Sequence, residues 1–90
     1  MNVVRKHIIF SGRVQGVGFR YTACYLASSL GLTGWVKNLW DGDVEMEVQG
    51  DEASISRLVE RLHEGRFIRI ERMETEMIPV IKESSFREIY

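Results

Sequence analysis

The 90-residue sequence has one cysteine, Cys24, one proline and two histidines, His7 and His63, that lie far apart in the chain. A lone thiol cannot form an internal disulfide. Two separated imidazoles do not make up the ligand set of a transition-metal site. The sequence therefore predicts a protein of a reducing compartment that holds no metal.

Long apolar runs and an excess of charge of one sign are also lacking. The N-terminal stretch MNVVRKHIIF carries two positive charges before only a short apolar run, and it has no signal-peptide cleavage site. A net charge of −1 does not favour nucleic acid or an acidic membrane surface as a partner. We therefore expect an unprocessed cytoplasmic protein, and any anion that it binds should be small.

The composition is that of an ordinary globular protein, with 44% apolar and 10% aromatic residues. A chain of this length buries roughly 60–65% of its unfolded surface when it folds. Residues 1–90 are therefore predicted to form a single domain.

Apolar periodicity in the first half of the chain predicts a strand, a helix and a hairpin. Residues 7–14 alternate, and an apolar stripe at helical spacing follows over residues 19–30, which Gly31 is well placed to end. Residues 34–39 and 43–49 flank an Asp-Gly pair, which is a strong hairpin signal. In the second arm, apolar and acidic residues alternate, so one face of the sheet should be covered by helices.

The second half predicts another helix and two strands. Asp51 is a suitable N-cap for a helix with an apolar stripe that should end near Gly65. Residues 67–73 alternate as a strand does, Pro79 makes a continuous central strand over 74–84 unlikely, and a short strand is expected over 86–90. The order β-α-β-β-α-β is that of a ferredoxin-like α+β sandwich, with two helices on one face of an antiparallel sheet.

The densest cluster of glycine lies in GRVQGVGFR, residues 12–20, between the first strand and the first helix. A glycine-rich segment at this position can turn several backbone N–H groups toward one point, where a phosphate group can bind. Arg20 would add a full positive charge. Alone, such a segment is more often a tight turn, and the arginine a solvated surface charge.

Two extended motifs resemble those of the acylphosphatase family. The pattern G-x-V-Q-G-V-x-F-R is met at Gly12, Val14, Gln15, Gly16, Val17, Phe19 and Arg20. A second pattern is met at Gly34, Trp35, Asn38, Gly42, Val44 and Gly50. The chain departs from the family at Gly65-Arg66, where relatives often have Gly-Pro, and its ending FREIY matches the usual ending only loosely.

The resemblance implies a hydrolase that cleaves acyl phosphates, the mixed anhydrides of a carboxylic acid and phosphate, without metal, cofactor or covalent phosphoenzyme. It assigns phosphate binding and catalysis to Arg20 and the orientation of water to Asn38. The predicted amide cradle comprises Gln15, Gly16, Val17, Gly18 and Phe19. Phosphate or sulfate is expected to bind there as a product-like ligand.

Other residues that often carry chemistry have simpler interpretations. His7 and His63 are expected to face solvent, Cys24 to be a small buried thiol, and Trp35 to belong to the core. Trp40 lies at the expected hairpin tip, close to Asn38, and is a candidate to line the acyl side of the site.

Two alternatives compete with a free-standing hydrolase. RNA-recognition domains share this element order, but the predicted third strand, DVEMEVQ, carries acids where those domains carry basic and aromatic residues. The other alternative is a phosphate-binding or carbamoyl-phosphate-handling part of a larger maturation protein. The absence of zinc-finger cysteines favours the free-standing hydrolase over it.

Overall fold

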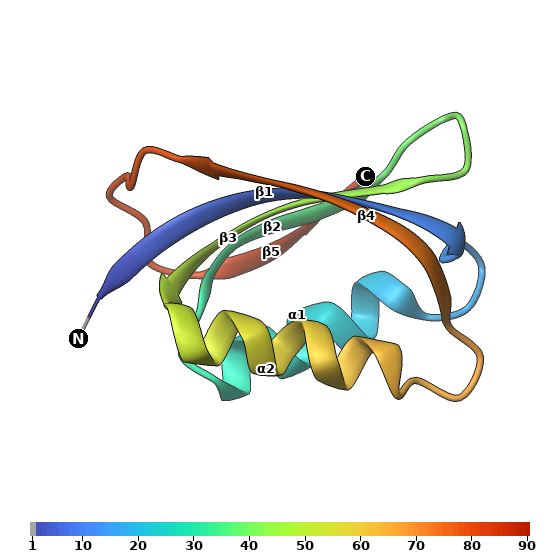
Figure 1. Ribbon diagram of the computed structural model, residues 1–90, viewed down its shortest axis with the longest axis horizontal. Helices are drawn as coiled ribbons and strands as arrows, with labels where there is room; N and C mark the ends of the chain where they lie inside the picture. The colour runs from blue at the N-terminus through green and yellow to red at the C-terminus, as the bar shows by residue number, and fades with distance from the viewer. Residues whose placement is uncertain (1) are drawn as a thin grey trace.

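A computed structural model of the protein describes residues 2–90, which form two helices and five strands (Figure 1). Their bounds are β1 Val3–Arg13, α1 Phe19–Ser29, β2 Thr33–Asn38, β3 Val44–Asp51, α2 Glu52–His63, β4 Arg69–Ile78 and β5 Phe86–Ile89. The predicted element order is confirmed, as is the short final strand. Asp51 occupies the N-cap position of α2, although its side chain makes no capping hydrogen bond.

The sheet has the strand order β4-β1-β3-β2-β5. The predicted antiparallel pairing is confirmed for the neighbouring strands among β1, β2, β3 and β4. The last strand, β5, instead pairs in parallel with β2, and its Phe86 lies beside Gly34. Because β4 and β5 are opposite edges of the sheet, residues 79–85 cross from one edge to the other before β5 begins (Figure 1). This crossing brings the C-terminal strand next to the strand that ends at Asn38.

Both helices cover the same face of the sheet, and the core lies between them and the strands (Figure 1). The predicted alternation of β3 is confirmed, since Val44, Met46 and Val48 are fully buried on this face. The prediction that Trp35 belongs to the core is wrong. Its neighbours Gly34 and Val36 are buried toward the helices, so the indole lies half-buried on the opposite face, 5.9 Å from the Lys37 ammonium.

The face of the sheet away from the helices holds a buried cation. Arg5 is only 2% exposed, because the 79–85 segment lies against it. Its guanidinium donates to Glu83 at 2.7 Å and to Glu47 at 2.9 Å. Gln49 accepts a further bond from Arg5 and pairs with the backbone of Ile81 through both of its amide atoms. Burial alone would lower the pKa of Arg5, but the bonds to Glu83 and Glu47 outweigh it and raise that pKa.

We expect Arg5→Ala to lower the free energy of unfolding by about 2–3 kcal/mol, because it leaves two partly buried carboxylates without their cation. The partial exposure of Glu47 and Glu83 keeps this value below that of a fully buried pair. Urea unfolding of the variant measures the loss. Arg57→Ala on the exposed side of α2 is the control, and equal stability of the two variants would contradict the prediction.

Candidate functional site

The loop between β1 and α1 has a backbone that depends on two glycines. Gly16 and Gly18 adopt φ values of 73° and 78°, and Gly18 is the N-cap residue of α1. A Cβ atom at either position would meet no neighbour within 4 Å, so it is the left-handed backbone rather than space that favours glycine. Residues in this conformation are a feature of backbone nests that bind anions.

The backbone N–H groups of this loop and of the first helical turn point to no protein acceptor. Thr22 is the first residue whose N–H donates within the helix, to Gly18 at 3.0 Å. Within residues 2–90, no backbone N–H from residue 15 to residue 21 makes a hydrogen bond to the protein. The positive end of the α1 dipole lies at the same place. The segment therefore offers a run of free donors to an anion.

A hollow of about 160 Å³ opens beside these donors. Its lining residues are Val14, Gly16, Gly18, Phe19, Arg20, Tyr21, Asn38 and Glu88. Arg20 comes from the first turn of α1, and Asn38 is the last residue of β2. The structure thus brings the two predicted functional side chains to one hollow, together with Gly16, Gly18 and Phe19 of the predicted amide cradle.

Gln15 and Val17, the remaining residues of the predicted cradle, do not line the hollow. The Gln15 side chain instead donates to the carbonyl oxygens of Leu39 at 2.6 Å and Asp43 at 2.8 Å. It thereby ties the loop to the hairpin that follows Asn38. Val17 is partly buried and packs against the core.

The hairpin after Asn38 is held by its own hydrogen bonds. The N–H of Leu39 donates to Asp43 at 2.8 Å, and the N–H of Asp43 donates to the Asp41 carboxylate at 3.0 Å. These bonds confirm the expected turn and fix the backbone next to Asn38. Trp40 at the tip is 99% exposed and does not line the hollow, so its candidate role at the acyl side is not supported.

The C-terminal strand contacts Arg20, although none of its residues is among the site residues predicted from the sequence. The Arg20 Nε atom lies 3.5 Å from a Glu88 carboxylate oxygen, and Nη1 donates to the Ile89 carbonyl at 3.4 Å. The guanidinium carbon also lies 4.9 Å from the ring centroid of Tyr90. No local motif could reveal these contacts, because they depend on the parallel pairing of β5 with β2.

The whole-chain comparison decides the family. The acylphosphatase family model matches residues 6–88, a range that contains the loop, Arg20, Asn38 and Glu88. The chain belongs to the acylphosphatase family.

Two acylphosphatases match the chain over nearly their whole length. A curated acylphosphatase of Geobacillus kaustophilus is 47% identical over 88 residues, which is 96% of this chain and 94% of that protein. The solved structure of an acylphosphatase from Coxiella burnetii has a TM-score of 0.90 and 43% identity, covering 98% of this chain and 94% of that one. The crystal structure of T.kodakarensis HypF matches with a TM-score of 0.84 and 36% identity, and the match covers 97% of this chain but only 12% of that one.

The histidines and the cysteine of the protein lie outside the hollow. His7 lies on the face of the sheet away from the helices, with Nε2 2.7 Å from a Glu45 carboxylate oxygen, and His63 is exposed at the end of α2. Cys24 is half-buried on α1. Burial raises the pKa of its thiol, the Glu88 carboxylate raises it further, and Arg20 partly offsets both, so the thiol is not activated as a nucleophile.

Among residues 2–90, no three His, Cys, Asp and Glu side chains are grouped so that they could hold a metal ion. No helix of these residues is both long and apolar enough to cross a bilayer.

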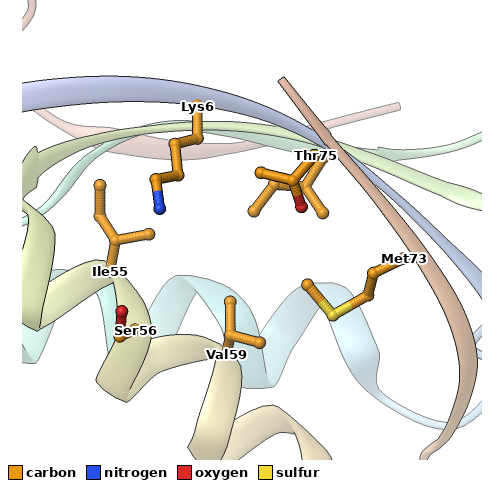
Figure 2. A pocket seen from close by; sticks show the side chains of 7 residues that line it. Lys6, Ile55, Ser56, Val59, Met73 and Thr75 are labelled. Carbon is orange, nitrogen blue, oxygen red and sulfur yellow. The ribbon is translucent and has the colours of Figure 1, made fainter. Parts of the chain in front are cut away.

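A second hollow, of about 220 Å³, lies between α2 and the strands β1 and β4 (Figure 2). It is lined mainly by apolar side chains such as Ile55, Val59 and Met73, and the Lys6 side chain extends into it from β1. The Lys6 ammonium lies 3.3 Å from the Glu52 carboxylate. This hollow contains neither the glycine-rich loop nor Asn38.

Proposed function

We propose that this protein hydrolyses acyl phosphates at the hollow beside the glycine-rich loop. The phosphoryl oxygens accept hydrogen bonds from the free loop amides and from Arg20, and Asn38 orients the attacking water. The observation that carries the proposal is that Arg20, Asn38 and the unpaired N–H groups of the loop meet at one hollow of about 160 Å³. Phosphate and sulfate are expected to bind there and to inhibit competitively.

The reaction exchanges one bond at phosphorus for another. The water oxygen bonds to phosphorus while the bond between phosphorus and the acyl oxygen breaks, and the carboxylate leaves with the electron pair. The water proton passes to the phosphate product or to solvent. The conjugate acid of the leaving group has a pKa of about 4 to 5, judged by Asp and Glu side chains, so the carboxylate departs without a proton. A general acid is therefore not required.

Stabilisation of charge is then the main task of the protein. Phosphoryl transfer places negative charge on the equatorial oxygens, and fixed hydrogen-bond donors can stabilise it without rearranging. The Arg20 guanidinium carries a positive charge and presents several donors in one plane. The side chain of Asn38 is no base at neutral pH, but it can both donate to and accept from a water molecule and so hold it in line with the phosphorus.

Hydrolysis of benzoyl phosphate in ¹⁸O-labelled water, with a chelator present, tests this proposal. Attack on phosphorus places the label in inorganic phosphate, and turnover should be unaffected by the chelator. Simple alkyl phosphomonoesters, which lack a good leaving group, should be cleaved poorly by the same sample. Label in the benzoate, loss of turnover with the chelator, or comparable turnover of an alkyl ester would contradict the proposed chemistry.

A further inference from the structure

Glu88 places a negative charge in the hollow that we assign to a negatively charged substrate. Its side chain lines this hollow, and its carboxylate lies 3.5 Å from Arg20 Nε. Both side chains are about one quarter exposed. The position follows from the register of β5, in which Glu88 pairs with Val36 and points to the helix side of the sheet, as Val36 does. The proposed mechanism has no use for this carboxylate.

We propose that the Glu88 carboxylate competes with phosphoryl groups for Arg20. It thereby weakens the binding of both the acyl phosphate and the phosphate product. The inference rests on the proposed function, because it concerns the same hollow. In the free protein the carboxylate occupies the Nε side of the guanidinium. A phosphoryl group that enters must displace this carboxylate or bind next to it, and both carry a cost in binding free energy.

The other contacts of Arg20 show why one carboxylate can matter. Nη1 already donates to the Ile89 carbonyl, and the guanidinium carbon lies 4.9 Å from the Tyr90 ring. The Nε edge faced by Glu88 is therefore a large part of what remains for an anion. Because the pair is partly exposed, solvent screens the repulsion, so we expect an effect of about tenfold in affinity rather than a complete block.

The charge of Glu88 opposes substrate and product alike. A change of this kind alters the binding of the ground state and the transition state together, so it appears in KM and in product inhibition more than in kcat. Weaker product binding also lets phosphate leave the hollow sooner. Glu88 thus sets the range of substrate concentration in which the protein works.

The test compares the wild-type protein with Glu88→Gln, which keeps the size of the side chain and removes its charge. Calorimetric titration with inorganic phosphate should show binding about tenfold tighter in the variant, with KM for benzoyl phosphate lowered by a similar factor. Glu60→Gln, an equal change of charge on the exposed side of α2, should leave both values unchanged. Circular dichroism checks the fold of each variant. Glu88→Ala serves as a second variant that also removes the carboxylate charge.

Three results of the binding and kinetic measurements would overturn the inference. Weaker phosphate binding in Glu88→Gln would mean that the carboxylate positions Arg20 for the anion, whereas unchanged binding would mean that it has no influence. A collapse of kcat with unchanged phosphate affinity would make Glu88 a catalytic base. Failure of the proposed function is distinguishable from all three, since the wild-type protein would then neither bind phosphate in the hollow nor hydrolyse benzoyl phosphate.

Cys24 provides a readout that does not involve activity. The Glu88 carboxylate helps burial to raise the pKa of this thiol, while Arg20 lowers it. Removing the carboxylate charge should therefore increase the thiolate fraction at pH values below that pKa, and iodoacetamide should alkylate Cys24 faster in Glu88→Gln than in Glu60→Gln. Equal alkylation rates would show that the Glu88 charge does not act at this place and would contradict the inference.

Discussion

Arg20→Ala is expected to reduce kcat/KM for benzoyl phosphate by about 10³-fold or more, the range observed when an arginine that stabilises a transferring phosphoryl group is lost. Arg20 is the only arginine or lysine among the residues that line the hollow. Its removal leaves the loop amides, which carry only partial charges, to stabilise the equatorial oxygens. The neighbouring carboxylate of Glu88 would then stand in the hollow without its cation, which adds to the loss.

Two comparisons separate this effect from damage to the fold. Arg57→Ala, on the exposed side of α2, removes the same charge outside the hollow and should keep wild-type turnover. Arg20→Lys keeps the charge but not the planar group of donors, so it should recover only a small part of the activity. If Arg20→Ala folds normally and still turns over benzoyl phosphate at more than about a tenth of the wild-type rate, Arg20 does not have the role assigned to it.

Asn38→Ala is expected to lower kcat by about 10²–10³-fold. The loss of one well-placed hydrogen-bonding group at a reacting centre lowers kcat by this factor in other enzymes. Asn38 is the last residue of β2, and the hairpin bonds of Leu39 and Asp43 fix its backbone. The variant should therefore keep its fold and its affinity for inorganic phosphate while the water loses its orientation. The combination to measure is steady-state kcat together with calorimetric phosphate binding.

Asn38→Asp is the matched comparison, because it has almost the same shape. Its carboxylate can still accept a hydrogen bond from water but repels a phosphoryl group, so both phosphate affinity and turnover should fall. A kcat of Asn38→Ala close to that of the wild type would refute the water-orienting role. A loss of phosphate binding equal to the loss of kcat would instead make Asn38 a phosphate ligand.

The sequence predicts the helices and the central strands well because their apolar periodicity is local. It misses the first residues of β1, which begins at Val3 instead of residue 7. Arg5 interrupts the alternation there, and this charge is paired in the fold with residues far away in sequence, such as Glu83, 78 positions away. The last part of β4, up to Ile78, is missed for a different reason. It belongs to an edge strand with mostly exposed side chains, so no apolar face marks it.

The candidate site also has a part that the sequence predicts and a part that it does not. The glycine-rich loop, Arg20 and Asn38 lie in motifs that are contiguous in sequence, and the structure brings them to one hollow. The bond from Gln15 to the hairpin and the contact of Glu88 with Arg20 join segments that only the tertiary fold brings together. These long-range contacts decide how the loop is held and what charge surrounds Arg20, and no local pattern contains them.

The most direct test of the account is to titrate ¹⁵N-labelled protein with inorganic phosphate and to follow the amide signals by nuclear magnetic resonance. We expect the largest shifts for the backbone N–H groups of Gly16, Gly18 and Phe19, the Nε of Arg20 and the side-chain amide of Asn38. They should saturate together with one dissociation constant. Unmoved signals at these positions, or largest shifts around Lys6 and Thr75 in the hollow under α2, would contradict it.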